Sequence, residues 1–584
     1  MKPSNQNLFL AIALWLGCMV ALYTFFPEVV GAKRAQSPTQ KTITSAAPQP
    51  AAPPIASAPG VQPAPAPAAK PGAVPRGTSA RPPPRVVVFE TPRALVAATS
   101  EGAAIESVQL LGEKWTRHKG GKEESRVDLV GPRAGEPLPF STVVRGADGT
   151  AVIPADAVYE VLKQDAHSVT FRTEQGGLTV TKTLSVDPQS YGIRLAMDAR
   201  AAVGFNGQVA VLAGAHAEEP QGGLFASRSN TPARAICLSA NDKVERLAIG
   251  AKTPVFEGQG AGFAGIDEQY FLTAVLPPAG MPATCRLEAQ GQKSGSLVSS
   301  LTVPLKVAPG GAAQLSFSGY AGPKSDTELG AAGAVLRHAI DWGFWSVIAE
   351  ILLGVMKFFQ SIVPGHNWGV AIILLTLAMK AVTFPLQHKS MKSMQEMQRI
   401  QPQLEELKKK YAGDTQRQNL EQMKLFKEHG VNPMGSCLPM LIQMPIWFAL
   451  YTTLQVSVEL YNAPFIPGWL DDLTAKDPYY ILPVAMGITM ILTQVLTPSP
   501  MSNPSQKTMG YAMSGFFSLL MLTLPSGLTL YIFTNNVLSI GQQIYLRRTI
   551  GKPPASGQTV EVQKKKDDRP DSGDGASVRA KLRA

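Results

Sequence analysis

The sequence is poor in charge and in the side chains that hold metal ions. Charged residues make up 17% of its 584 residues, whereas 45% are hydrophobic. The four cysteines show no metal-ligand spacing, and the large polar region shows no pair of carboxylates at a spacing typical of acid–base catalysis. These absences predict neither an enzyme nor a bound cofactor. The composition indicates several domains, some embedded in a membrane and some exposed to water.

Lysine and arginine outnumber aspartate and glutamate by 54 to 43, which gives a net charge of +11. We do not interpret this surplus as a DNA-binding signal, because the basic residues lie in segments that flank apolar runs. Cys18 and Cys437 lie in or beside such runs. Cys237 and Cys285 lie in the large polar region, and whether they form a disulfide is left open by the sequence.

The first apolar run, residues 7–26, follows Lys2 and is long enough to cross a bilayer. A cleaved signal peptide is the alternative, but no small-x-small cleavage site follows closely. We therefore expect an uncleaved anchor over residues 1–28, with its N-terminus in the cytoplasm. Residues 29–85 are rich in proline and alanine and predict an extended periplasmic linker.

Residues 86–322 consist of many short runs with a period of two. The run SVTFRTEQGGLTVTKTLSV alternates on both sides of Gly176-Gly177, which predicts a hairpin. Because no helical pattern intervenes, the region predicts a large antiparallel, all-β sandwich. His167 and His216 lie in it, and we interpret them as ordinary surface histidines rather than as a carbohydrate-processing site.

The second half of the chain is organised around residues 369–386, GVAIILLTLAMKAVTFPL. This stretch is apolar enough for a span, yet Lys380 lies on one helical face with Thr376, Thr383 and Gln387. A charge within a spanning helix costs roughly 2.5–3.5 kcal/mol on insertion scales, so it usually faces a wet cavity. Snorkelling of Lys380 to the interface is the alternative, but it does not explain the aligned threonines.

Apolar and polar segments alternate over the remaining sequence. Residues 341–363 predict an amphipathic helix in the membrane interface, and the charged residues 387–433 predict a cytoplasmic hairpin of two helices. The other predicted segments are spans at 435–456, 479–496, 509–524 and 528–546, a short acidic periplasmic loop at 457–478 and a basic cytoplasmic tail at 547–584. The prediction is an α-helical membrane bundle of six spans plus the β-sandwich, with both termini cytoplasmic.

Polar side chains recur along the C-terminal spans, notably Gln443 and Asn536. Such residues often serve only as hydrogen bonds between helices. Together with one lysine and no acidic partner, they predict a hydrophilic groove suited to polar or acidic stretches of a crossing polypeptide. The predicted hairpin carries apolar side chains that either capture substrate or hold its two helices together: Met391, Met394, Met397, Met423 and Phe426.

Four long motifs resemble the YidC/Oxa family of membrane protein insertases. They are NWGVAIILLTLAMKAVTFPL, VNPMGSCLPMLIQMPIWFALY, DPYYILPVAMGITM and LPSGLTLYIFTNN, within residues 340–548. The resemblance implies an inner-membrane insertase that works alone or beside the Sec translocon, with a periplasmic domain similar to sugar-binding supersandwiches. It also implies that Thr376, Gln443 and Tyr531 occupy groove or substrate-contacting positions. Where the family usually has arginine this sequence has Lys380, which cannot bind a carboxylate in bidentate fashion.

We therefore expect an insertase that catalyses no covalent step. A nascent inner-membrane protein would meet the hairpin first and then place its polar part in the groove, while its apolar helix moves into lipid. The tail and hairpin are expected to contact the ribosome, and the tail also anionic lipid. A secondary transporter of a small anion is the alternative, although no repeated half and no matched pair of broken helices is present.

Overall fold

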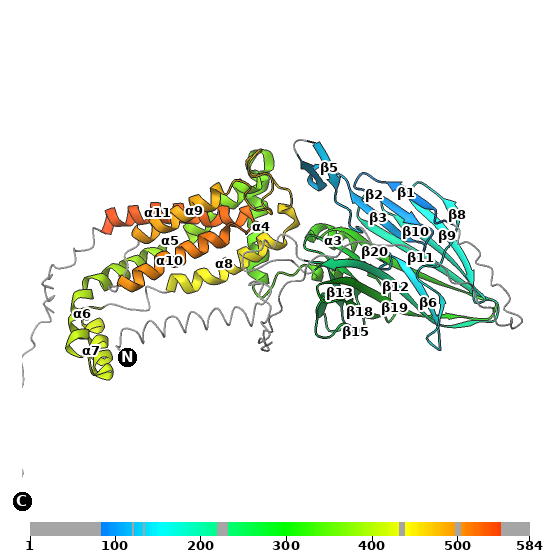
Figure 1. Ribbon diagram of the computed structural model, residues 1–584, viewed down its shortest axis with the longest axis horizontal. Coiled ribbons are helices and arrows are strands. Elements are labelled where there is room, and N and C mark those ends of the chain that lie inside the picture. Colours follow the sequence, from blue (N-terminus) through cyan, green and yellow to red (C-terminus); the bar gives the residue numbers. More distant parts are fainter. Residues whose placement is uncertain are drawn as a thin grey trace, which may run out of the picture. The chain divides into compact units, whose positions relative to one another are not determined.

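The computed structural model describes residues 83–119, 122–131, 135–218, 232–430, 438–496 and 504–550 (Figure 1). The predicted anchor, most of the predicted linker, Cys18, Cys437 and the tail beyond Ile550 lie outside the described residues. The chain divides into two compact units. The first comprises the chain up to Thr376 together with Pro445–Met486 and Phe517–Phe533, and the second comprises Leu377–Met444, Gly487–Phe516 and the chain from Thr534.

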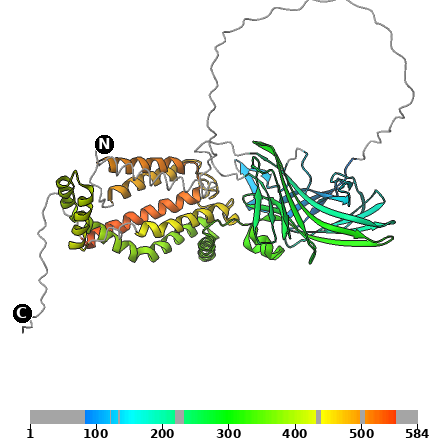
Figure 2. The same ribbon diagram turned by 90° about the horizontal axis from the view of Figure 1, so that it is seen from below.

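Two large antiparallel sheets make up most of the first unit and pack face to face (Figures 1 and 2). The nine-stranded sheet has the order β14 (Val244–Leu247), β13 (Arg234–Leu238), β16 (Phe263–Asp267), β17 (Phe271–Leu276), β20 (Ala312–Pro323), β11 (Gly192–Ala201), β10 (Leu178–Val186), β9 (Ser168–Gln175), β8 (Glu160–Gln164). The six-stranded sheet has the order β15 (Val255–Gln259), β18 (Thr284–Gln290), β19 (Ser294–Val307), β12 (Phe205–Glu218), β6 (Ser141–Gly146), β7 (Ala151–Ile153). The prediction of a β-sandwich is confirmed.

Two smaller sheets complete the β-structure. They are formed by β1 (Val86–Glu90), β2 (Ala94–Thr99) and β3 (Ala104–Leu110), and by β4 (Thr116–Lys119) and β5 (Lys122–Arg126). The predicted hairpin at Gly176-Gly177 joins β9 to β10, with Gln175 opposite Leu178. Both glycines have positive φ, 57° and 75°, as a two-residue hairpin turn between right-twisted strands requires.

The alternation of β10 places five side chains in the core: Leu178, Val180, Lys182, Leu184 and Val186. Four are apolar, as a strand buried on one face requires. Lys182 is the exception, and the period of two alone did not mark it as a buried lysine.

A disulfide joins Cys237 of β13 to Cys285 of β18. Because these strands belong to different sheets, the bond links the two layers of the sandwich. This decides the pairing that the sequence left open.

The helical elements follow the sandwich. They are α3 (Asp326–Ala332), α4 (Ser346–Ile362), α5 (Trp368–Arg399), α6 (Gln401–Lys410), α7 (Thr415–Glu428), α8 (Leu438–Val456), α9 (Ile481–Leu496), α10 (Pro504–Met521) and α11 (Ser526–Ile550), with 3₁₀ turns at Glu113–Trp115, Ala334–Ala339, Pro364–His366 and Val458–Leu460. One helical stretch among the described residues, Trp368–Met394, is long and apolar enough to cross a membrane by length and composition, and Ile481–Leu496 is apolar but shorter.

Helix α5 does not end near Leu386, where the sequence placed the end of the span. It runs through Pro385 to Arg399. Proline removes one backbone donor from a helix, but the Lys, Met, Gln and Glu residues that follow are good helix formers, so the helix resumes. The first part of the predicted hairpin is therefore a continuation of the Lys380 helix.

Helix α4 lies in the segment predicted to be an amphipathic helix, but its apolar side chains are found on both a buried and an exposed face. Its buried residues are Ala349, Leu352, Leu353 and Met356, and large apolar side chains are also exposed at Val347, Ile351, Phe358 and Ile362. An apolar inner face therefore packs within the unit, and a second apolar face is exposed.

The loop between α8 and α9 packs against the sandwich within the first unit. The ring centroid of Tyr461 lies 5.8 Å from that of Trp115 and 5.5 Å from that of Phe271. The Asn462 amide donates a hydrogen bond of 2.8 Å to the carbonyl of Lys114. The sequence predicted an acidic loop over 457–478 but gave no indication of these contacts, two of which, with Lys114 and Trp115, join residues more than 300 positions apart.

Candidate functional site

The Lys380 ammonium lies in the second unit and donates a hydrogen bond of 2.7 Å to Ser539 Oγ. The Ser539 hydroxyl in turn donates to the carbonyl of Asn535, also at 2.7 Å. Helices α8 to α11 contain no aspartate or glutamate. The Lys380 side chain is half-buried. Its charge is stabilised by the Ser539 hydroxyl, which is itself bound to the Asn535 carbonyl, at a position where an ion pair would be expected.

Two amide side chains of α11, those of Asn536 and Gln542, lie three residues before and three residues after Ser539. Among the described residues, the side-chain nitrogens of Asn536 and Gln542 are buried without a hydrogen-bond partner. Amide N–H groups and an ammonium are donors, so together with Lys380 they form a set that is rich in donors and poor in negative charge. An unpaired buried donor costs about 1–3 kcal/mol, which a ligand with acceptor oxygens would offset.

The other predicted groove residues have different surroundings. Thr383 donates to the carbonyl of Met379 at 2.9 Å and accepts from Gln387 at 3.3 Å, so its hydroxyl is engaged on its own helix. Gln443, on α8, is half-buried in the second unit. Thr376 and Tyr531 belong to the first unit, where both are buried, and the Thr376 hydroxyl donates to the carbonyl of Ile372.

Helices α6 and α7 lie beside each other in the second unit (Figures 1 and 2). Ile400 and Leu404 form a small buried cluster, against which Met397 and Phe426 pack together with Leu425. These two predicted capture residues therefore hold the hairpin together.

The remaining methionines of the hairpin region differ in exposure. Met391 is buried and Met394 is half-buried, whereas Met423 is 60% exposed. Leu420, three residues before Met423 on α7, is 58% exposed, so the two side chains share one face of the helix. Leu420 was missed in the sequence because only methionine and aromatic residues were considered there.

A pocket of 370 Å³ in the second unit is lined by Phe384, Pro385, His388, Lys389 and Tyr545. Aromatic rings form much of its wall, with Phe384 and Tyr545 centroids 6.4 Å apart. Within the described part of the chain, no group of three or more His, Cys, Asp or Glu side chains is placed to hold a metal ion.

Two residues of the Lys380 surroundings were not among the predicted site residues. Ser539 is the direct partner of the ammonium, and Gln542 supplies an unpaired donor. The signal that could find them is the polar spacing of α11, where Ser539 and Gln542 follow Asn536 at steps of three. The sequence predicts a polar stripe of Asn536, Ser539 and Gln543 on the last span, but it does not show which of these side chains meets Lys380.

Comparisons with known proteins cover almost the whole chain. The family described as "60Kd inner membrane protein" matches residues 358–553, and the YidC periplasmic domain matches residues 86–355. A protein from Anaeromyxobacter dehalogenans (strain 2CP-C), named membrane protein insertase YidC, is 42% identical over 579 residues, 96% of this chain and 100% of the relative. A protein of the same name from Geobacter sulfurreducens is 35% identical over 477 residues, 80% of this chain and 87% of the relative. A crystal structure of an active YidC insertase, 20% identical, covers 79% of this chain and 92% of that chain with a TM-score of 0.34.

These matches define the class first: a membrane protein insertase of the inner membrane, with a periplasmic β-sandwich, and the function for which the family is named is not enzymatic. Its substrates are accordingly nascent membrane proteins. The chain belongs to the YidC family of membrane protein insertases. The resemblance found in the sequence motifs is confirmed, whereas the relatives give the anion-transporter alternative no support.

Proposed function

We propose that this insertase receives polar and acidic stretches of its substrates in a hydrophilic groove whose one positive charge is Lys380. The observation that carries the proposal is the hydrogen bond from Lys380 to Ser539, with no aspartate or glutamate on helices α8 to α11 to neutralise the charge. A positive charge that is bound only by neutral groups can still attract a negatively charged group, because no ion pair neutralises it. Acceptor oxygens of a passing segment would satisfy it and the unpaired amides of Asn536 and Gln542.

The groove is proposed to lie within a bundle of six spans with both termini in the cytoplasm. Helix α9 supports a membrane location, because its exposed face is a continuous apolar stripe: Ile481, Val484, Ile488, Ile491, Leu492 and Val495. Side chains of this kind repeat every three or four residues, as on a helix surface that faces lipid. The segment that a substrate inserts would leave toward such surfaces, driven by hydrophobic transfer.

We further propose that the substrate first meets the hairpin of α6 and α7. The surface suited to this is the exposed pair Leu420 and Met423, since Met397 and Phe426 are occupied within the hairpin. A methionine and a leucine beside charged residues bind varied apolar segments weakly. The proposed partners at this stage are the ribosome, the Sec translocon and anionic lipid.

The test of the groove compares Lys380→Arg, Lys380→Ala and Lys380→Glu with substrates that differ only in the charge of the translocated tail. At an effective dielectric constant of 20, two unit charges 4 Å apart interact by about 4 kcal/mol. Lys380→Glu should therefore insert acidic-tailed substrates at least about tenfold less well than the parent, since tenfold needs only about 1.4 kcal/mol. Lys380→Arg should retain insertion, and Lys380→Ala should fall between them.

The matched control is Lys392→Glu, an equal charge change at an exposed position of the same helix. It should leave the preference between acidic and neutral tails unchanged. Insertion is measured in liposomes at equal protein levels. Equal insertion of acidic and neutral tails by Lys380→Glu would show that the charge has no electrostatic role.

The capture step has its own test, in which Leu420→Ser and Met423→Ser are combined. Crosslinking of a nascent chain to α7 should fall, because the exposed apolar area there is removed. Lys427→Ser, at another exposed position of α7, is the control. Undiminished crosslinking in the double variant would exclude this face as the capture surface.

A further inference from the structure

A carboxylate, an imidazole and a hydroxyl form a connected chain in the periplasmic sandwich. His216 Nδ1 lies 3.0 Å from Glu136 Oε1, and His216 Nε2 lies 2.9 Å from Ser294 Oγ. The Glu136 side chain is 2% exposed, that of His216 is 32% exposed, and Ser294 is exposed. Burial therefore decreases from the acid to the hydroxyl, and the hydroxyl is the member that a molecule in solution can reach.

The fold builds this arrangement from three separate segments. His216 lies on β12, and Ser294 begins β19, which pairs with β12. The segment that carries Glu136 crosses β12 at Gly214, where a Cβ atom would lie 2.7 Å from the carbonyl oxygen of Pro137 and 3.1 Å from Glu136 Cβ. Gly214 and His216 are two residues apart and share one face of the strand, so the missing side chain at Gly214 admits Glu136 beside the imidazole.

We propose that Ser294 is an activated nucleophile that accepts acyl groups from esters or thioesters, with His216 as its general base and Glu136 as the residue that positions the imidazole. When Nδ1–H donates to the buried carboxylate, Nε2 is the acceptor for the serine proton. A serine hydroxyl is a weak nucleophile without such a base. Glu136, His216 and Ser294 follow one another at hydrogen-bond distance, so the imidazole is placed to take the hydroxyl proton and make the serine a stronger nucleophile.

The reaction balances with water as the only co-reactant. Ser294 Oγ bonds to the acyl carbon while His216 Nε2 takes the hydroxyl proton, and the bond from the acyl carbon to the leaving oxygen or sulfur breaks as His216 returns that proton to it. Water then attacks the acyl-serine and loses a proton to His216. The bond from the acyl carbon to Ser294 Oγ breaks as His216 passes that proton to Oγ, which releases the carboxylic acid and regenerates the Ser294 hydroxyl. With an activated ester the acyl-serine is expected to form faster than it hydrolyses, because the activated leaving group departs more easily than the serine alkoxide.

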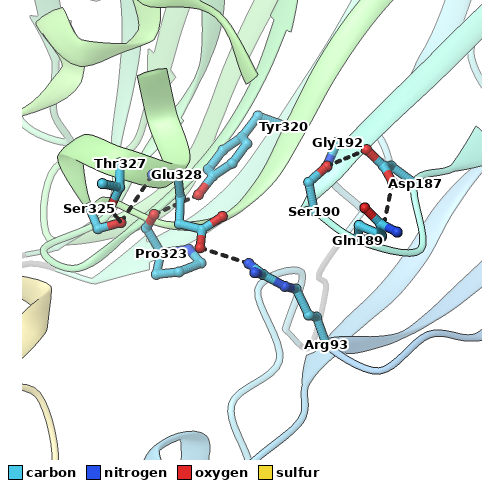
Figure 3. Close-up of polar contacts among 10 residues, drawn as sticks. All are labelled: Arg93, Asp187, Gln189, Ser190, Gly192, Tyr320, Pro323, Ser325, Thr327 and Glu328. Atoms are coloured by element: carbon cyan, nitrogen blue, oxygen red, sulfur yellow. Dashed lines mark hydrogen bonds and ion pairs between the residues drawn. The ribbon is translucent and has the colours of Figure 1, made fainter. Parts of the chain in front are cut away.

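The chain contains a matched control for this inference. Ser190 donates to Asp187 at 2.7 Å, so it is a serine hydroxyl bound to a carboxylate with no imidazole between them (Figure 3). Ser190 is half-buried, whereas Ser294 is exposed. The part of the reactivity difference that reports the histidine is therefore the part that His216→Gln removes, because that variant leaves Ser294 in place.

The experiment treats the full chain in detergent with a fluorophosphonate, whose phosphorus is attacked by activated serine hydroxyls with loss of fluoride, and maps the labelled peptide by mass spectrometry. General-base assistance contributes about 10²- to 10⁴-fold, so Ser294 should be labelled at least about tenfold faster than Ser190. Ser294→Ala should abolish the label and His216→Gln should reduce its rate to that of Ser190, while Ser190→Ala changes neither. With p-nitrophenyl acetate, the parent should release a burst of nitrophenolate stoichiometric with Ser294.

Variants of Glu136 separate positioning from a merely structural role. Glu136→Gln keeps an oxygen that accepts from Nδ1–H and should retain more of the labelling rate than Glu136→Ala. A structural role would instead lower the unfolding temperature in Glu136→Ala and leave the labelling rate of the folded fraction unchanged. Labelling of Ser294 no faster than Ser190, or undiminished in His216→Gln, would overturn the proposal.

Discussion

Lys182 and Lys380 show how the sandwich and the helical region hold a lysine away from water. Lys182 is fully buried, and its Nζ donates to the carbonyls of Gly102 at 2.7 Å and Phe140 at 3.1 Å. Lys380 is half-buried and donates to one hydroxyl, that of Ser539. The sandwich encloses its lysine with rigid backbone acceptors, whereas the helical region leaves its lysine with capacity to bind something else.

The consequence for protonation is clear in the sandwich. Burial lowers the pKa of Lys182 well below its ordinary value, so the folded protein favours the neutral amine, whose two N–H groups match the two carbonyls. Gly102 and Phe140 both have positive φ, 69° and 65°. We infer that the amine stabilises two turns whose carbonyls would otherwise be buried without a donor.

The largest expected effect concerns the bond between the two layers of the sandwich. Replacing Cys237 and Cys285 together by serine removes a crosslink between residues 48 positions apart, which should destabilise the sandwich by about 4 kcal/mol in the chain-entropy account. Urea unfolding followed by tryptophan fluorescence measures this. Reducing agent should destabilise the parent to the same extent and have no effect on the variant. A urea midpoint that is the same in the variant and the parent would mean that packing alone holds the two layers together.

The next effect sharpens the comparison of the two lysines. At pH 10, Lys182→Met should destabilise the sandwich by about 2–4 kcal/mol, because two buried carbonyls lose their donor. As pH falls, the unfolded parent binds a proton that the folded parent does not, so the parent loses stability and its advantage over the variant shrinks. Lys163→Met, at an exposed lysine, is the control and should change stability by less than about 0.5 kcal/mol. A pH-independent difference would mean that Lys182 stays charged.

Glu268 should give a smaller pH effect of opposite sign. Burial raises its pKa to about 7, against the attraction of Lys324. Between pH 4.5 and 7 the folded state binds more protons than the unfolded state, so this group's contribution makes the sandwich less stable as pH rises through that window. Glu268→Gln should remove that part of the slope, as read from unfolding temperatures at pH 5 and pH 7.5. Parallel temperature shifts in parent and variant would assign the slope to other groups.

The smallest expected effect on stability is that of Lys380→Met. Only one hydrogen bond to a half-buried hydroxyl is lost, so unfolding should change by about 1 kcal/mol or less. Insertion of acidic-tailed substrates should nevertheless fall, because the charge is absent. Thermal unfolding in detergent and liposome insertion, measured on one preparation, distinguish the two outcomes. A large loss of stability would mean that Lys380 stabilises the fold as Lys182 does, and would contradict the proposed difference between the two lysines.

Much of the architecture could be predicted from patterns in the sequence. Alternation with a period of two indicated the sandwich and the Gly176-Gly177 hairpin, because side chains on a strand must alternate between core and surface. The motif around Lys380 identified the family. Helix α5 continues to Arg399, past the predicted end of the span at Leu386, because the helix formers after Pro385 outweigh the local effect of that proline.

By itself the sequence determined which segments are apolar, where strands and helices alternate and which family the chain belongs to, since these depend on local patterns and long motifs. Only the tertiary structure decided the partners of individual polar groups. Lys182 meets two carbonyls distant in sequence, Cys237 meets Cys285, and Glu136, His216 and Ser294 come from three segments. Hydrogen bonds and disulfides require contact within a few ångströms, and chain folding alone brings such distant residues together.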